Sequence, residues 1–125
     1  MRALILAAGE GTRLRPLTAD RPKCLVAFRG RTLLGWQRRA LEVAGVTDVT
    51  VVTGYRSEAV EALGVPTRHN ARFAETNMVA SLFAAEDLLD ADLVIVYGDI
   101  VFEPRLIEAL LAEPAPFAMV VNTAW

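Results

Sequence analysis

Short apolar runs rich in β-branched residues alternate with segments of helical spacing, and this alternation constrains the fold more than any other feature of the chain. The apolar runs predict strands over residues 3–7, 48–53, 66–69, 93–97 and 117–122. The helical spacing predicts helices over residues 33–44, 57–63, 77–89 and 104–112. Strands that alternate with helices favour an α/β fold, in which a mostly parallel sheet is covered by helices on both faces.

The segment that follows the first strand combines glycines with spaced cations. Gly9 and Gly11 remove side chains where backbone N–H groups would approach anionic oxygens. Arg13 brings a planar fork of donors to the same segment, and Lys23 brings a mobile point charge. We therefore interpret residues 7–23 as a loop that folds around the phosphates of a nucleoside triphosphate.

A second polar feature follows the apolar run over residues 93–97. Gly98 and Asp99 stand where this strand is expected to end. Ligands of parallel sheets bind outside the carboxyl ends of the strands. If this strand is a neighbour of the first one, the glycine loop and Asp99 face the same crevice.

Length and charge narrow the classes of function. The chain has 125 residues, enough for one domain with a core but not for two. Its net charge of −2 argues against a nucleic-acid partner, although residues 1–39 carry nine Lys and Arg residues and only two acids. A local basic region on an acidic protein suits a compact anionic ligand. We expect this positive charge to gather around the glycine loop.

The sequence contains few features that indicate a cellular compartment. No apolar run approaches the roughly 18–20 residues of a membrane span, and the start of the sequence does not have the pattern of a signal peptide. The single cysteine, Cys24, excludes an internal disulfide framework and fits a reducing compartment. We expect a cytoplasmic protein without a membrane partner.

Two common phosphate-binding motifs do not fit the loop. A dinucleotide fingerprint would have a third glycine where Leu14 stands, and its second strand would begin well before Asp48. A Walker A loop needs a Gly-Lys-Ser/Thr sequence, which the chain does not contain. Pro16 and Pro22 instead stiffen a long excursion that can return Lys23 to phosphates held by the glycines.

Three separated motifs together resemble a known family. Residues 6–14 read Leu-Ala-Ala-Gly-Glu-Gly-Thr-Arg-Leu, and with Pro22-Lys23 they are similar to the signature of the nucleotidyltransferases that activate sugar phosphates and phosphocholine. Gly98-Asp99 is similar to that family's metal-binding aspartate. The resemblance implies a Rossmann-like, three-layer α/β/α fold of the nucleotide-diphospho-sugar transferase type.

A fourth motif narrows the resemblance. Residues 77–82 read Asn-Met-Val-Ala-Ser-Leu, which resembles the Asn-x-x-x-Ser-Leu segment of cytidylyltransferases that act on phosphocholine or aminoethylphosphonate. Sugar nucleotidyltransferases usually have a Gln-x-x-Pro-x-Gly type of segment at this place, and the sequence has none.

The resemblance also implies roles for individual residues. Arg13 and Lys23 would be the catalytic cations, on the β/γ-phosphates and the α-phosphate respectively, and Asp99 would hold Mg²⁺. The residues implied in nucleotide binding are Leu6, Ala7, Ala8, Gly9, Gly11, Thr12, Asn77 and Ser81. Asn77 either caps a helix or contacts the ligand, and Ser81 either shares that contact or is a small buried helical residue.

The implied reaction is attack by an acceptor phosphate on the α-phosphorus of a nucleoside triphosphate, with release of pyrophosphate. CTP and a small phosphorylated acceptor such as phosphocholine are the expected substrates. A sugar-1-phosphate nucleotidyltransferase and a nucleotide-binding module without turnover are the alternatives.

The resemblance covers nearly the whole chain, but the chain covers only half of that family's domain. Residues 1–125 are therefore expected to be the N-terminal nucleotide-binding part of an apparently truncated domain. A parallel sheet that is cut midway exposes an edge and an apolar face. We expect a homo-oligomer that associates through residues 117–125.

Overall fold

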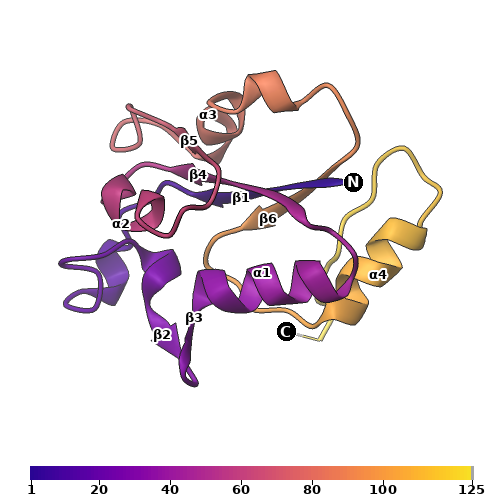
Figure 1. Ribbon diagram of the computed structural model, residues 1–125, viewed down its shortest axis with the longest axis horizontal. Coiled ribbons are helices and arrows are strands. Elements are labelled where there is room, and N and C mark those ends of the chain that lie inside the picture. Colours follow the sequence, from indigo (N-terminus) through magenta and orange to yellow (C-terminus); the bar gives the residue numbers. More distant parts are fainter. Residues whose placement is uncertain (125) are drawn as a thin grey trace.

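A four-stranded parallel sheet forms the centre of the computed structural model, which describes residues 1–124. Its strands are ordered β5-β4-β1-β6, and they span Arg2–Ala7 (β1), Asp48–Thr53 (β4), Thr67–His69 (β5) and Leu93–Tyr97 (β6). β1 lies in the middle and pairs with β4 on one side and β6 on the other. Figure 1 shows the sheet between two layers of helices.

Successive residues of β1 point to opposite faces of the sheet and pack against different helical layers. Ile5 packs into a core with residues of the helices α1 (Leu33–Val43), α2 (Ser57–Glu61) and α4 (Pro104–Ala112). Leu4 points to the opposite face, where it packs with residues of and after α3 (Met78–Phe83). Each fully buried Leu or Ile contributes about 1.5–3 kcal/mol relative to exposure. The expected three-layer α/β/α architecture with a parallel sheet is confirmed.

Local signals explain where the helices begin and end. The Thr32 hydroxyl accepts a hydrogen bond from the Gly35 amide at 3.0 Å and so caps α1. Gly45 follows that helix with a φ of 86°, a conformation that glycine adopts without strain. Pro104 is the first residue of α4, where its missing N–H is not needed.

The helix expected over residues 77–89 is shorter than predicted. α3 ends at Phe83, and a separate 3-10 turn, η3 (Glu86–Leu88), follows it. The break falls at Ala85, whose φ of −112° and ψ of 30° leave the helical region. Ala85 is completely buried against the sheet, so the chain gives up a helical turn to pack this small side chain close to the strands.

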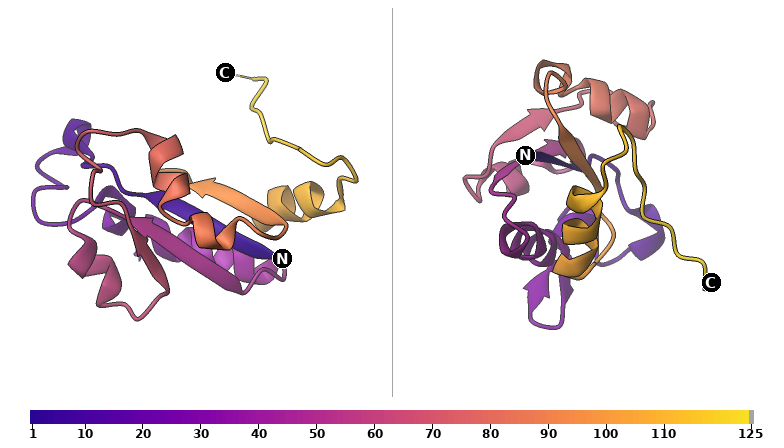
Figure 2. Two further views of the ribbon diagram at one scale, coloured as in Figure 1. Left: turned by 90° about the horizontal axis from the view of Figure 1, so that it is seen from above. Right: turned by 90° about the vertical axis from the view of Figure 1, so that its right-hand side faces the viewer.

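The strand predicted over residues 117–122 is wrong. This segment forms no ladder in the part of the chain that the structure describes, and β6 remains the edge of the sheet. Figure 2 shows the end of the chain leading away from the sheet. Its apolar composition gave the strand signal, but a strand also needs a partner with free backbone groups alongside it.

Residues 23–32 contain local structure that the sequence analysis did not predict. Strands β2 (Ala27–Phe28) and β3 (Arg31–Thr32) form a small antiparallel hairpin beside the first turn of α1. Arg29 and Gly30 make its turn with positive φ angles of 48° and 79°. Two 3-10 turns precede the hairpin, η1 (Thr12–Leu14) and η2 (Lys23–Leu25).

Within residues 1–124, the structure contains no helix with the length and apolar character to cross a membrane.

Candidate functional site

The glycine loop and Asp99 leave the sheet at the carboxyl ends of two adjacent strands. β1 and β6 pair in parallel register, with Leu6 opposite Tyr97. The Gly98 amide donates to the Leu6 carbonyl at 2.8 Å, which extends the ladder beyond the strand end. The condition stated for a shared crevice, that these two strands be neighbours, is therefore confirmed.

Lys23 meets Asp99 directly. The Lys23 Nζ donates to Asp99 Oδ2 at 3.1 Å, although 76 positions separate the two residues. Lys23 begins η2, and Pro22 before it is extended, so the excursion from the glycine loop ends by returning the lysine to the sheet edge. Both side chains are partly exposed, and a ligand can reach both charges.

Gly11 is packed against the return of the loop. It has a φ of 63°, and a Cβ built on it would lie 3.1 Å from the Lys23 Cβ and 3.0 Å from the Thr18 Cγ2. The buried Thr18 hydroxyl donates to the Gly11 carbonyl at 2.7 Å. A side chain at position 11 would therefore be strained and crowded, which is a structural reason for glycine here.

The loop is anchored from outside by the turn that follows β4. The Tyr55 hydroxyl donates toward the carbonyls of Thr18, at 2.9 Å, and Ala19, at 3.1 Å. The Arg56 guanidinium also donates to the Ala19 carbonyl, at 3.3 Å. The Tyr55 amide donates to the Ala8 carbonyl at 3.0 Å, so the same residue holds the beginning of the loop.

Arg13 lies exposed on η1, and within residues 1–124 it has no ion-pair or side-chain hydrogen-bond partner. By contrast, Arg15 lies 3.6 Å from Glu10. Arg21 is bonded to Asp20, and this contact raises the pKa of Arg21 and lowers the pKa of Asp20. Arg13 is thus a free cation on the same loop that holds Lys23.

The positive charge is less concentrated than the sequence analysis expected. Arg2 lies at the opposite end of β1, where its guanidinium binds Asp48 at 2.9 Å. Arg29 and Arg31 belong to the hairpin, where they stack over Phe28 and Trp36. The folded chain carries only part of its basic residues to the glycine loop, because the others serve pairs and stacks elsewhere.

The backbone from Leu6 to Ala8 is closely surrounded. The carbonyls of Leu6 and Ala8 already accept the amides of Gly98 and Tyr55. A Cβ on Gly98 would lie 2.8 Å from the Leu6 oxygen, and one on Gly54 would lie 2.6 Å from the Ala8 oxygen. Ala7 is partly exposed between them, and Gly9 is open to solvent. The remaining predicted residue of this loop, Thr12, is exposed at the start of η1.

Asn77 and Ser81 have different surroundings. The exposed Asn77 caps α3, because its Oδ1 accepts the amides of Val79 at 3.0 Å and Ala80 at 3.3 Å. The Asn77 amide nitrogen has no hydrogen-bond partner within residues 1–124. Ser81 is 5% exposed, and its Oγ accepts a hydrogen bond from the buried Asn70 at 3.1 Å. Ser81 therefore supports the loop before α3, and its contact with a ligand stays a prediction.

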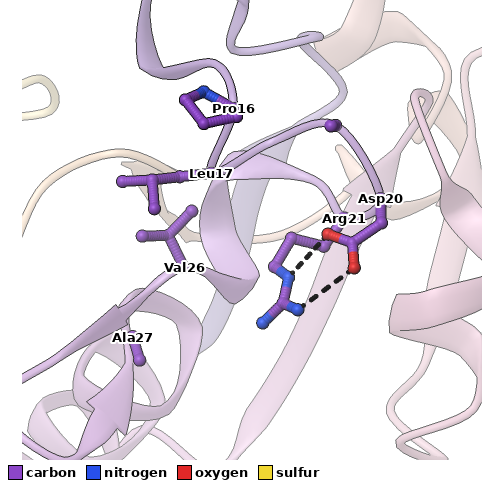
Figure 3. A pocket seen from close by; sticks show the side chains of 7 residues that line it. Pro16, Leu17, Asp20, Arg21, Val26 and Ala27 are labelled. Carbon is purple, nitrogen blue, oxygen red and sulfur yellow. Dashed lines mark hydrogen bonds and ion pairs between the residues drawn. The ribbon is translucent and has the colours of Figure 1, made fainter.

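Two hollows in the described surface lie on the outer side of the loop. The larger one, about 620 Å³, is lined by Pro16, Leu17, Ala19, Asp20, Arg21, Val26 and Ala27, and Figure 3 shows it with the Asp20–Arg21 pair. The smaller one, about 360 Å³, also includes Asp20 and Arg21. Neither contains Lys23 or Asp99.

Asp99 is the only group of the predicted metal site that the described chain supplies. Residues 1–124 contain no cluster of three or more His, Cys, Asp or Glu side chains that could hold a metal ion. A single exposed carboxylate beside a lysine nevertheless fits Mg²⁺ that arrives with phosphates, since this ion keeps several waters and uses one or two carboxylates.

Sequence reasoning missed two residues that shape the site. Tyr55 is the first of them, and its hydrogen bonds to the loop carry no local sequence signal. Gln37 did carry one: it is the single amide on the stripe of α1 that also contains Leu34 and Leu41. It is completely buried.

Known proteins similar to this chain are nucleotidyltransferases. CTP:phosphoglutamine cytidylyltransferase from Campylobacter jejuni is 35% identical over 136 aligned positions, which cover all of this chain and 54% of that protein. UTP–glucose-1-phosphate uridylyltransferase from Haloferax volcanii is 36% identical over 112 positions, which cover 85% of this chain and 46% of that protein. The chain thus spans about half the length of these relatives.

A solved structure agrees in fold with this chain. CTP:phosphocholine cytidylyltransferase from Streptococcus pneumoniae superposes with a TM-score of 0.74 at 34% identity, over 83% of this chain and 49% of that one. The family model of the MobA-like NTP transferase domain matches residues 3–124. The fold, the order of motifs and this match agree, and the chain belongs to the MobA-like NTP transferase domain family.

Proposed function

We propose that this chain is the nucleotide-binding part of a cytidylyltransferase that transfers CMP from CTP to a small phosphorylated acceptor such as phosphocholine. Pyrophosphate leaves as the acceptor phosphate attacks the α-phosphorus. Similarity to cytidylyltransferases for phosphoglutamine and phosphocholine supports the reaction class and the base.

One observation carries the proposal: the Lys23 ammonium and the Asp99 carboxylate are 3.1 Å apart at the ends of adjacent strands, directly beside the glycine loop. A lone ion pair on a surface would contribute little stability, about 0–1 kcal/mol. The pair is better understood as two charges that separate when a ligand binds. Lys23 would then contact phosphate oxygens, and Asp99 would contact the cation that accompanies them.

The chain's own residues supply positioning and charge. Phosphate is already an anion at neutral pH, so the acceptor needs no general base. The free Arg13 guanidinium suits the β- and γ-phosphates, because its fork binds two oxygens at once. Lys23 suits the α-phosphate, where a mobile ammonium can follow the charge that develops in the transition state.

Asp99 is the residue that would hold Mg²⁺, together with the substrate phosphates. The ion, when bound, would neutralise the phosphate charge as a Lewis acid. The contact with Lys23 holds this carboxylate at the sheet edge before the nucleotide enters. Other nucleotide contacts would come from Gly9, Thr12 and the free amide nitrogen of Asn77.

Two alternatives each have support. A sugar-1-phosphate nucleotidyltransferase is supported by the similarity to the uridylyltransferase from Haloferax volcanii. A binding module without turnover is supported by the length of the chain, which is about half that of its relatives. The motif over residues 77–82 favours the first proposal over a sugar acceptor.

Pyrophosphate release is the measurement that separates these functions. The chain is incubated with Mg²⁺, each of the four common ribonucleoside triphosphates, and phosphocholine, phosphoglutamine or glucose 1-phosphate. We expect release with CTP and an amine-bearing phosphorylated acceptor. Release with UTP and glucose 1-phosphate supports the sugar enzyme instead, and CTP binding without release supports the module. Absence of binding to any triphosphate contradicts all three.

A further inference from the structure

Gln37 is a buried amide placed directly behind the turn that carries Asp99. Its side chain is completely inaccessible, and it lies on the face of α1 that otherwise buries Leu34 and Leu41. A glutamine on an apolar stripe is costly unless its polar atoms are bonded. Its bonds therefore indicate what the residue does.

Both hydrogen bonds of Gln37 go to one short turn. Its Nε2 donates to the carbonyl of Tyr97 at 2.8 Å and to the carbonyl of Ile100 at 2.6 Å. Both partners are carbonyl oxygens, so the side chain must turn its NH₂ group toward them. The two residues between these carbonyls are Gly98 and Asp99.

The remaining bonds of the turn are few. Gly98 is held by its amide to the Leu6 carbonyl, and the Ile100 amide reaches the Tyr97 carbonyl only at 3.4 Å. Asp99 and Ile100 are exposed, so packing does not fix them. Gln37 is thus the only side chain within residues 1–124 that donates hydrogen bonds to both ends of the turn.

The carbonyl oxygen of the Gln37 side chain indicates that a contribution to folding stability does not by itself explain a glutamine at this position. Gln37 Oε1 is buried and has no hydrogen-bond partner in the described chain. An unsatisfied buried acceptor is destabilising. The arrangement thus gives up one acceptor in order to bring two donors to the Asp99 turn.

We propose that Gln37 is a positioning residue for Asp99: its amide ties together the two ends of the Tyr97–Ile100 turn and so fixes the carboxylate opposite Lys23. The importance of that carboxylate rests on the proposed function. The tie itself is a property of the folded chain and is testable without a ligand.

Amide hydrogen exchange of the chain without nucleotide is the first test. Q37M replaces the glutamine by methionine, a residue of similar length without hydrogen-bond donors. In this variant the amides of Gly98 and Ile100 should exchange about tenfold faster, measured relative to the amides of β1. The matched control is L41A on the same stripe of α1, which destabilises the whole fold and should raise the exchange of the turn and of β1 together. An unchanged ratio in Q37M overturns the proposal.

A second variant guards against failure of Q37M to fold. Q37E has the same shape but brings oxygen atoms against the two carbonyls, so it too should loosen the turn relative to β1. Equal exchange ratios in Q37E and the unmodified chain contradict the proposal as directly as they would for Q37M.

Nucleotide binding is the second test, with a readout that a merely structural role would not move. Q37M should weaken CTP binding in Mg²⁺ about ten- to hundredfold and leave CTP binding in EDTA unchanged. In a D99N background the Q37M effect should disappear, because the residue acts through Asp99. An equal loss with and without Mg²⁺, or an undiminished loss in D99N, overturns the proposal.

The two tests separate two kinds of failure. If the unmodified chain binds no nucleotide, the proposed function fails, while hydrogen exchange still decides whether Gln37 ties the turn. If nucleotide binds and the exchange ratio stays constant in both variants, the positioning role fails and the proposed function stands.

Discussion

The Nζ of Lys23 lies 3.1 Å from the carboxylate of Asp99, although the two residues are 76 positions apart in the sequence. Lys23 comes at the end of a stiff excursion after β1, and Asp99 comes directly after β6. Each sits where a parallel sheet presents its carboxyl edge, so the pairing is a consequence of strand order.

Removing the Lys23 charge should affect function much more than stability. We expect K23A to lower the rate of pyrophosphate release, or CTP affinity if turnover is absent, about hundred- to thousandfold. The free energy of unfolding should change by no more than about 1 kcal/mol, because the ion pair is partly exposed. Initial rates and denaturant titrations measure both. K23R, which keeps the charge, is the control and should lose less; activity of K23A near that of the unmodified chain would rule out the assigned role.

Two glycines of the site should respond differently to alanine. A Cβ at Gly98 would lie 2.8 Å from the Leu6 oxygen, so G98A should destabilise the fold by about 1–3 kcal/mol. Gly9 has nothing within 4 Å of the same position, so G9A should change stability by less than about 0.5 kcal/mol. G9A should nevertheless weaken nucleotide binding, because its methyl group stands where phosphate oxygens are expected. Urea denaturation measures the stability of G98A and G9A, and CTP titration measures their nucleotide affinity. Equal losses of stability in the two variants would refute this prediction.

The buried thiol of Cys24 should make stability fall at high pH. Burial raises the pKa of Cys24 from 9.0 to about 11. Between these pH values the unfolded chain loses the thiol proton and the folded chain keeps it, so the free energy of unfolding decreases as pH rises. The loss should reach about 2 kcal/mol at pH 11 and approach about 3 kcal/mol above it. Parallel denaturation series of the unmodified chain and C24A measure it, and identical pH slopes in the two proteins would disprove the effect.

Self-association should occur through the open edge of the sheet. Ile95 of β6 is 46% exposed, and Phe117 and Met119 are 81% and 69% exposed. We expect light scattering to give a mass above the 13.6 kDa of one chain. I95K and M119K should reduce this mass toward that of a monomer, whereas L63K, at an exposed apolar residue after α2, should not. A monodisperse monomer for the unmodified chain contradicts this expectation.

Loss of the Tyr55 hydroxyl should loosen the glycine loop. Y55F removes the donor to the carbonyls of Thr18 and Ala19 and should cost about 1 kcal/mol. Trypsin should then cleave faster after Arg13, which is exposed in the loop and is followed by Leu14 rather than by proline. Y97F is the matched control, because the Tyr97 hydroxyl has no hydrogen bond within residues 1–124. Equal cleavage rates in the two variants would show that the anchor does not hold the loop.

The fold was largely predictable because its signals are local. The alternation of β1, α1, β4 and β6 appears as changes of hydrophobic period, and Thr32 and Pro104 mark helix starts by their own chemistry. The break at Ala85 was not predictable, because it depends on how closely one methyl group packs against strands far away in sequence. The strand expected over residues 117–122 failed for a related reason, since strand propensity does not provide a partner.

The meeting of Lys23 and Asp99 was predictable, whereas the contacts that support their segments were not. Lys23 and Asp99 stand in motifs, and strand order brings them together. Tyr55 and Gln37 act on backbone carbonyls of other segments, and a carbonyl leaves no trace in the sequence. Only the three-dimensional arrangement identifies such contacts.

The anchor of the loop at Tyr55 has an evolutionary consequence. Its hydroxyl addresses main-chain oxygens, so replacing the side chain of Ala19 would leave the attachment intact. The loop can therefore exchange its surface chemistry while keeping its shape. Substitutions in the loop that change ligand specificity would therefore not require a compensating change at Tyr55.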